Sequence, residues 1–384
     1  MKVLHVLASN QRRGAEVFAR DLVDRLGDLD QRVAVLCQHD DGLVFGAPTM
    51  VLGSGGPKAR VPLRAMRALD SAVRKWKPDV IQAHGGESLK LLSPTLVRGR
   101  PPVAYRRIGL TPDWMARGLR IRLHRMLIGR AQAIVAVADA VAEETMDQFG
   151  IAADRVTVIP NAVDSGRVRS LRSRSETRGS LGVADDAPVV LFAGALNEEK
   201  NPLAVVDVAL QVVRELPEVI FLVAGEGPHR RSLEERIRAS HSDHVILLGP
   251  RTDLPDLMAA SDALVCTSRT EGLPALLIEA GFVGLPVVGF DVGGVSEVVA
   301  DGSTGLLVPP GDKDRLSAQL VSVLKDKRLA RTLGEGAAAR CERMFEIGPI
   351  ADHYRALYAA LAAGSRWNSA EFASFVYEEK TSGA

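Results

Sequence analysis

The chain has 384 residues, 46% of them hydrophobic and 25% charged, with a formal net charge of +1, as in a soluble globular protein of about two domains. No run approaches the roughly 20 apolar residues of a membrane span, and the apolar start at residues 2–7 is too short for a signal peptide. The three cysteines are too few and too far apart to indicate a disulfide framework or a metal site, so we expect a cytoplasmic protein.

Short β-branched runs alternate with helical patterns in the first half of the chain. The pattern predicts strands at residues 2–7, 32–37, 79–83, 103–105, 133–137 and 156–159. It predicts helices at residues 15–26, 62–76, 113–129 and 139–149. Strands that alternate with helices indicate a parallel sheet covered on both faces. Residues 1–164 hold 24 Lys/Arg against 17 Asp/Glu, an excess that indicates either an anionic partner or a solvated surface.

Residues 167–182 interrupt this alternation with arginines, serines and glycines, a composition typical of a linker. The alternation then resumes, with strands predicted at residues 189–193, 219–224, 245–248, 263–267 and 286–289, and helices at residues 202–214, 230–239, 254–260 and 275–283. We therefore predict an α/β protein of two Rossmann-like domains facing a cleft. The expected divisions are an N-terminal domain at 1–164, a linker at 165–186, a C-terminal domain at 187–345, a helix at 346–362 and an aperiodic tail at 363–384.

Two glutamates stand eight positions apart after the predicted strand at residues 263–267. Glu271 precedes Gly272, which can adopt backbone angles closed to other residues, and Pro274 suits the first turn of a helix. Glu279 then falls within that helix. Because carboxylates accept from sugar hydroxyls and a helix start attracts anions, the stretch suits a ligand with sugar and phosphate groups. The alternative is an acidic loop followed by an ordinary amphipathic helix.

Further candidate residues lie where predicted strands of the first half end. Arg13 and Gly14 connect the first strand to the first helix, where a glycine lets the backbone approach a phosphate. The full dinucleotide glycine pattern is absent, so a plain tight turn is the alternative. His84 ends another strand beside two glycines, where it suits a hydrogen bond with a sugar hydroxyl or is simply a surface histidine.

Glycine turns also follow strands of the second half. Gly194 opens a loop that ends at Lys200, whose ammonium is placed to meet a diphosphate as a point charge. Glu226 lies between two glycines in the next turn, and Gly293 opens a third. A solvated lysine or a tight turn is the ordinary interpretation of each. Several such turns at one sheet edge together favour a ligand site.

In these motifs the chain resembles the GT-B fold glycosyltransferases of the large retaining class that uses nucleotide-sugar donors. The matching residues are the Glu271-x7-Glu279 pair with Gly272 and Pro274, Gly293-Gly294-x-x-Glu297, Gly305-Leu306-Leu307-Val308, Ile159-Pro160-Asn161-Ala162-Val163-Asp164, Asp79 to His84, and Gly14-Ala15-Glu16. The resemblance extends from Met1 to about residue 361 and is specific for the family, not for a substrate.

The resemblance implies a catalytic set of His84, Lys200 and Glu271. Glu279 would bind the ribose hydroxyls, Glu271 would hold the donor sugar, Lys200 would neutralise the diphosphate, and His84 would touch the transferred sugar. Arg251 would lie by the nucleotide base. Further donor contacts are implied for Arg13, Gly14, Gly194, Glu226, Gly272, Leu273 and Pro274.

The family's chemistry needs no protein nucleophile and no divalent metal, since the donor phosphate is thought to take the acceptor's proton. We accordingly expect no cofactor and no metal. The acceptor would be a hydroxyl of a glycan, lipid or small molecule in polysaccharide or glycolipid biosynthesis, with Arg106 and Arg107 near it. The arginine-studded helix predicted at residues 113–129 either contacts an anionic membrane surface, at the inner face of the plasma membrane, or packs its apolar side and solvates the rest. No nucleic-acid partner is expected.

Two departures from the family's pattern stand out. Ala195 follows Gly194, where similar proteins carry an arginine that pairs with the diphosphate, and Arg13 replaces the first of two glycines. We hypothesise that Arg13 compensates for Ala195. Otherwise the chain is a nucleotide-sugar binder without turnover. An epimerase and a Rossmann oxidoreductase are further alternatives, against which the glutamate spacing and the incomplete glycine pattern argue.

Overall fold

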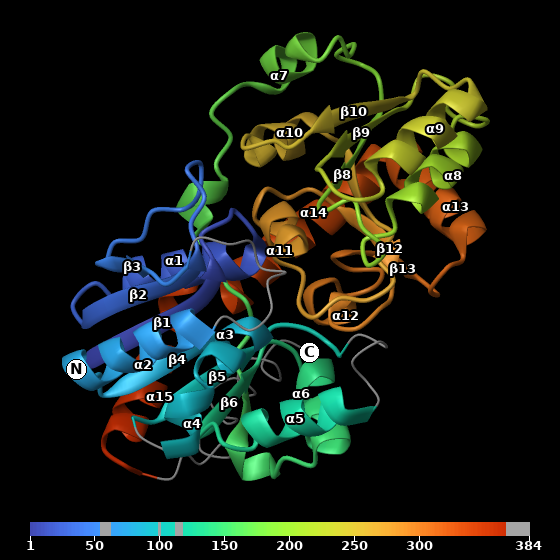
Figure 1. The fold of residues 1–384 in the computed structure, drawn as a ribbon. Helices are drawn as coiled ribbons and strands as arrows, with labels where there is room; N and C mark the ends of the chain where they lie inside the picture. The colour runs from blue at the N-terminus through green and yellow to red at the C-terminus, as the bar shows by residue number, and fades with distance from the viewer. Residues whose placement is uncertain (54–62, 99–100, 112–117, 366–384) are drawn as a thin grey trace. The chain divides into compact units, whose positions relative to one another are not determined.

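A computed structural model describes residues 1–53, 63–98, 101–111 and 118–365 (Figure 1). The chain divides into two compact units. Unit 1 comprises Met1–Ala162 together with the last helix, which begins at Ile347, and unit 2 comprises Val163–Glu346. From residue 366 the predicted tail lies outside the described residues. Within those residues, no helix is both long enough and apolar enough to cross a bilayer.

Unit 1 contains a seven-stranded sheet in which every neighbouring pair is parallel, in the order β3-β2-β1-β4-β5-β6-β7. The strands are β1 (Lys2–Ser9), β2 (Asp30–Cys37), β3 (Thr49–Val51), β4 (Val80–His84), β5 (Val103–Arg107), β6 (Ala133–Ala136) and β7 (Val156–Val158). Strands β4, β5 and β6 are buried along their whole length, as expected of strands covered on both faces. The edge strand β3 was not predicted, because it has only three residues and none of them is buried.

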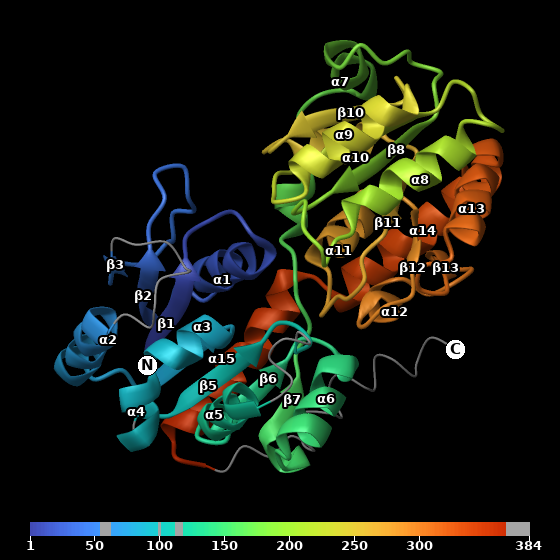
Figure 2. The same cartoon turned by 45° about the vertical axis from the view of Figure 1, so that its right-hand side comes forward.

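The helices of unit 1 cover both faces of this sheet. They are α1 (Gly14–Arg25), α2 (Leu63–Trp76), α3 (Gly86–Leu91), α4 (Ser93–Arg98), α5 (Gly118–Ile128), α6 (Asp139–Phe149) and α15 (Ile347–Ala362), with a short 3-10 helix η2 (Ala153–Arg155). Helices α1 and α15 pack together on one face, where Phe18 and Leu22 meet Tyr354 and Leu357 in a shared core (Figure 2). The last helix is therefore part of unit 1, although some 180 residues separate it from the rest of that unit.

Unit 2 contains a six-stranded parallel sheet in the order β10-β9-β8-β11-β12-β13. Its strands are β8 (Val189–Ala193), β9 (Ile220–Ala224), β10 (Val245–Gly249), β11 (Ala263–Cys266), β12 (Val287–Phe290) and β13 (Gly305–Val308). Its helices are η3 (Ser165–Val168), α7 (Arg174–Ser180), α8 (Pro202–Val212), α9 (Arg230–Ser240), α10 (Leu254–Ala260), α11 (Ala275–Phe282), α12 (Val295–Val298), α13 (Lys313–Lys325) and α14 (Lys327–Met344). Helix α8 packs beside α9 and α13, and α11 packs beside α14 (Figure 1). In both units, the strand order is that of the Rossmann fold.

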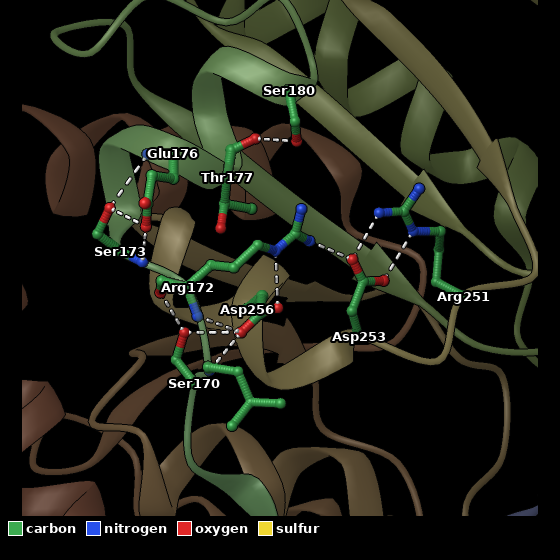
Figure 3. Close-up of polar contacts among 10 residues, drawn as sticks. Ser170, Arg172, Ser173, Glu176, Thr177, Ser180, Arg251, Asp253 and Asp256 are labelled. Atoms are coloured by element: carbon green, nitrogen blue, oxygen red, sulfur yellow. Dashed lines mark hydrogen bonds and ion pairs between the residues drawn. The ribbon is translucent and has the colours of Figure 1, made fainter.

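The segment expected as a linker at residues 165–186 is folded into unit 2. Asp256 on α10 accepts hydrogen bonds from the Ser170 hydroxyl at 2.8 Å, the Leu171 amide at 2.7 Å and Arg172 Nε at 3.0 Å (Figure 3). Arg178 is 1% exposed and donates to three backbone carbonyls of the turn that follows α7. Ser170, Arg172 and Arg178 are therefore donors to acidic side chains and carbonyls, and the segment expected as a linker is a packed part of unit 2.

Candidate functional site

The strand order of unit 2 indicates where a candidate functional site lies. The chain leaves β8 toward β9 on one side and β11 toward β12 on the other, so β8 and β11 flank the point where the order reverses. In open parallel sheets, ligands bind at the carboxyl ends of the two strands that flank this point. The loops that begin there are residues 194–201 after β8 and 267–274 after β11. These loops carry most of the donor-binding residues predicted from the sequence.

Lys200 and Glu271 form an ion pair that joins these two loops. The Lys200 ammonium lies 2.5 Å and 2.7 Å from the two carboxylate oxygens of Glu271, and the Ser268 hydroxyl donates to one of them at 2.6 Å. The Glu271 carboxylate is 6% exposed and the Lys200 side chain 27%. Burial pushes the pKa of Lys200 down, but attraction to Glu271 outweighs it, and the net pKa is raised. The ammonium is therefore charged at neutral pH and retains some access to solvent.

Backbone contacts fix the positions of both charges. The Thr267 hydroxyl donates to the carbonyls of Lys200 and Asn201, each at 3.1 Å. The Arg269 amide donates to the Glu199 carbonyl at 2.8 Å. Because these bonds join the two loops directly, the lysine and the glutamate are held in place by backbone as well as by their own attraction.

Glycines allow the loops after β8, β9, β11 and β12 to approach one another in pairs at this edge of the sheet. Gly225 has φ of +149°, and a Cβ there would lie 1.8 Å from the Gly194 carbonyl oxygen. Gly293 has φ of +53°, and its Cβ would lie 2.0 Å from the Glu271 carbonyl oxygen. Gly272 does not have a positive φ. The requirement for glycine expected at Gly272 is therefore met at Gly293, which touches the same loop from the next strand.

The other predicted donor residues lie on α11 and in the loops after β9, β10 and β11. Glu279 is the fifth residue of α11, is 14% exposed and accepts from Arg167 Nη2 at 3.0 Å. Arg251 donates to Asp253 at 2.8 Å and 2.6 Å, and Asp253 also pairs with Arg172 (Figure 3). Leu273 and Pro274 are buried at the start of α11. The Glu226 carbonyl accepts from the Leu196 amide at 2.9 Å, so its backbone braces the loop after β8 while its side chain pairs with Arg230.

In unit 1 the strand order reverses between β1 and β4. His84 is the last residue of β4 and is 5% exposed, with Nε2 3.2 Å from His5 Nδ1 on β1. Burial is the main cause that lowers the pKa of His84 well below its ordinary value, and the neighbouring His5 and the Arg106 charge lower it further. Arg13 occupies the N-cap position of α1 without a capping hydrogen bond from its side chain, and both it and Gly14 are exposed. The burial of His84 shows that the alternative of a surface histidine is wrong.

Arg106 and Arg107 were expected near the acceptor, after the strand predicted at residues 103–105, but the structure includes both in β5. Both end β5 and are 0% and 3% exposed. The Arg106 guanidinium lies 3.7 Å from the centroid of the Phe18 ring and donates to Asn161, and burial lowers its pKa. Arg107 pairs with Glu144. Neither side chain has the exposure that contact with an acceptor requires.

Sequence reasoning missed several residues of these two centres. Thr267 and Ser268 follow β11 directly, so their position at the strand end was an available signal. His5 and Gln31 gave no such signal, because each lies inside a strand. Within the described parts of the chain, no group of three or more His, Cys, Asp or Glu side chains is arranged to hold a metal ion.

Comparison with known proteins agrees with this fold. Residues 173–340 match the family Glycosyl transferases group 1, and residues 12–167 match Glycosyltransferase Family 4. N-acetyl-alpha-D-glucosaminyl L-malate synthase of Bacillus anthracis is 28% identical over 62% of this chain and 61% of its own length. D-inositol 3-phosphate glycosyltransferase of Streptomyces bingchenggensis is 26% identical over 88% of this chain and 83% of its own length. The chain thus spans less than two thirds of the first relative and most of the second.

Among solved structures, Anabaena HepE in complex with UDP-glucose is similar with a TM-score of 0.83 and 24% identity, over 94% of this chain and 100% of that chain. WaaG, a glycosyltransferase involved in lipopolysaccharide biosynthesis, is similar with a TM-score of 0.76 and 15% identity, over 93% and 99%. One matched family covers most of each unit, and both units have the strand order of the Rossmann fold. The chain therefore belongs to the GT-B fold glycosyltransferases.

Proposed function

We propose that this chain transfers a sugar from a nucleotide-diphosphate donor to a hydroxyl of a glycan, lipid or small-molecule acceptor. The observation that carries the proposal is the Lys200–Glu271 pair at the carboxyl ends of β8 and β11. An ammonium and a carboxylate held this close provide a phosphate contact beside an acceptor for sugar hydroxyls. The related proteins named as glycosyltransferases, and the HepE complex with UDP-glucose, support the same class of donor.

The proposed reaction retains the anomeric configuration and uses no divalent metal. The bond from the anomeric carbon to the donor phosphate breaks, and the acceptor oxygen bonds to the same face while its proton passes to the departing phosphate. The transition state resembles an oxocarbenium ion beside a diphosphate that gains negative charge. Lys200 stabilises that charge, while Glu271 holds hydroxyls of the donor sugar and Glu279 those of the ribose.

Binding of a series of nucleoside diphosphates and their sugars tests the donor site. A true donor raises the melting temperature of the parent chain by mass action, and Lys200→Met removes most of that shift. Lys325→Met is the matched control, because Lys325 pairs with Glu215 at 2.8 Å in the same unit but is 51% exposed. No shift with any nucleotide, or equal shifts in both variants, would contradict the proposed site.

Turnover is tested separately from binding. The chain should release nucleoside diphosphate from its donor slowly without acceptor and faster with one, and Lys200→Met should lower that rate on the order of 100-fold. Binding without release would favour a non-catalytic nucleotide-sugar binder. Ala195 is the reason to consider that role, because similar proteins carry an arginine at this position. NMR of the product reports the anomer. Undiminished turnover in EDTA is expected, and loss of turnover would refute metal independence.

We propose in addition that α5 contacts an anionic membrane surface. Leu119, Leu123 and Met126 recur at helical spacing on its exposed side and are 70%, 49% and 44% exposed, while Arg122 and Arg125 lie beside them. Arg117, within the helix predicted at residues 113–129, lies outside the described residues.

Flotation with anionic vesicles tests this contact. Replacing Leu119 and Leu123 by Gln should release the chain from the vesicles, whereas Leu171→Gln, at a position 93% exposed in unit 2, should not. A parent chain that does not float would refute the membrane contact.

A further inference from the structure

A line of three buried polar side chains crosses unit 1 from β2 to the strand end that carries His84. His5 Nε2 lies 3.0 Å from Gln31 Oε1, and His5 Nδ1 lies 3.2 Å from His84 Nε2. Gln31, His5 and His84 are 6%, 0% and 5% exposed. The two imidazole rings are within 21° of parallel with centroids 5.5 Å apart, a separation that fits rings meeting edge to edge through a hydrogen bond. The three side chains therefore form one continuous hydrogen-bonded line.

The direction of these bonds is set at Gln31. Its amide nitrogen donates to the backbone carbonyls of Val23 at 2.9 Å and Leu26 at 2.8 Å. Rotating the amide would place its oxygen against two carbonyl oxygens, so Oε1 must face His5 and can only accept. His5 Nε2 therefore carries a proton.

The proton on His5 Nε2 determines the tautomer of His84. Burial lowers the pKa of His5 to about 4, although the bond to Gln31 opposes this, so His5 is neutral at pH 7 and has one ring proton. With that proton on Nε2, its Nδ1 can only accept, and it must accept from His84 Nε2. The neutral His84 then has a lone pair at Nδ1, which is buried and has no hydrogen-bond partner among the described residues.

A buried acceptor without a partner is costly and calls for an explanation. This one lies at the end of β4, the strand beside the reversal of strand order in unit 1, where a ligand is expected. A lone pair with no proton accepts a hydrogen bond and donates none. A hydroxyl group of a sugar substrate supplies the missing donor, whereas a phosphate or carboxylate oxygen would be repelled.

We propose that Gln31 and His5 are positioning residues that hold His84 in the tautomer whose Nδ1 accepts a hydrogen bond from a substrate hydroxyl. This inference rests on the proposed function for the identity of the substrate. The tautomer itself is a property of the chain alone. It is therefore measurable whether or not sugar transfer is observed.

Two-dimensional NMR of the full chain labelled with 15N-histidine reads the tautomer directly at neutral pH. In the parent chain, His5 and His84 should each show a protonated Nε2 and an unprotonated Nδ1. Gln31→Leu removes the group that sets the direction, so His84 should become a mixture of both tautomers. Gln31→Glu should restore the parent pattern, because a buried glutamic acid is neutral, accepts from His5 through its carbonyl oxygen and donates through its hydroxyl.

Kinetics supplies the second measurement, once a donor has been found. Gln31→Leu should lower kcat on the order of tenfold while KM for the nucleotide-sugar stays nearly constant, and Gln31→Glu should recover most of the loss. Tyr358→Phe is the matched control. Its hydroxyl donates to Gln82 at 3.1 Å and is equally buried, but it takes no part in the line of bonds. This variant should lose stability without changing the His84 tautomer.

Two results would overturn the proposed tautomer of His84. A parent chain with the proton of His84 on Nδ1 overturns the inference, and so does a His84 tautomer in Gln31→Leu that is identical to the parent. The ring of His124, which lies on α5 outside the line, should be unchanged in every variant and serves as an internal reference. If Gln31→Leu does not fold, the parent and Gln31→Glu spectra still show whether His84 has the proposed tautomer. A correct tautomer in a chain without transferase activity would refute the proposed function and leave the positioning intact.

Discussion

The exchange Glu271→Gln tests the central charge pair of unit 2 without changing its volume. The substitution removes a carboxylate that receives the Lys200 ammonium at 2.5 Å and 2.7 Å and is 6% exposed. Hydrogen bonds to charged groups contribute about 1.5–3 kcal/mol each, and a partly buried ammonium left without its partner adds a desolvation cost. Partial exposure of Lys200 limits that cost. We therefore expect the free energy of unfolding to fall by about 2 kcal/mol, or roughly 4–8 °C in melting temperature for a unit of this size.

Thermal unfolding at pH 7 measures this loss. The attraction of Glu271 raises the pKa of Lys200, so the pair's contribution is complete below the ordinary lysine pKa and is lost as the pH rises through the folded-state value. The matched control is Glu215→Gln, which breaks a Lys–Glu pair of 2.8 Å in the same unit with side chains 57% and 51% exposed. Because exposed pairs contribute little, this control should lose less than about 0.5 kcal/mol.

A double-mutant cycle with Lys200→Met separates the pair from the general effect of each substitution. If the two groups interact as the structure indicates, the double variant should lose at least about 1 kcal/mol less than the two single losses together. Additivity within about 0.5 kcal/mol, or equal losses in Glu271→Gln and Glu215→Gln, would refute the reasoning.

Three further predictions concern the proposed donor site and the segment packed on α10. Glu279→Ala should weaken every nucleotide ligand in calorimetric titrations, whereas Glu271→Ala should reduce the preference for a nucleotide-sugar over the bare diphosphate; equal effects would contradict the division of roles. Arg13→Ala should lower kcat and Ala195→Arg should restore it in steady-state assays, since both positions are exposed and have room for a cation, and failure to rescue would end the compensation hypothesis. Burial raises the pKa of Asp256, but hydrogen bonds from the segment before α7 outweigh it and lower the pKa to about 2. Its stabilising contribution is therefore present above pH 4 and lost as the pH falls toward 2, so urea unfolding should show a smaller loss for Asp256→Asn at pH 2.5 than at pH 7.

Local sequence was sufficient for most of the fold. The strand predicted at residues 189–193 coincides with β8, because five apolar residues lie between a proline and a glycine that bound them. The helix predicted at residues 254–260 coincides with α10, which has a proline in its first turn. Strand β3 was missed because three residues do not establish a period.

The folded segment at residues 165–186 shows where composition misleads. Arginine and serine usually indicate solvent, and no local pattern reveals their acceptors. Asp253, Asp256 and Asp262 lie some 80 residues later and meet the segment only through tertiary packing of α7 on α10. Composition therefore predicted a linker, although Arg172 and Arg178 pair with acidic side chains of unit 2.

The residues of the candidate site that follow strands could be predicted from the sequence, whereas those inside strands could not. Lys200 and Glu271 stand in loops after strands, and parallel strands bring such loops to one edge, so both were found although 71 positions separate them. His5 lies within β1, where an alternating or continuous apolar run predicts a core position. Its contact with His84 depends on the register that pairs His5 with Gln82, which the sequence does not contain.

The same strand order in both units places a polar pair at each reversal of the sheet, and the chemistry of the two pairs differs. In unit 2, attraction keeps the Lys200 ammonium charged and in reach of solvent, which suits a group that carries negative charge. In unit 1, burial keeps both histidines neutral, so that pair offers a lone pair and repels anions. A diphosphate therefore has a favourable partner only in the pair of unit 2, whereas an uncharged hydroxyl suits the pair of unit 1. Glycosyl transfer needs both kinds of partner, and the burial of each pair determines which one it supplies.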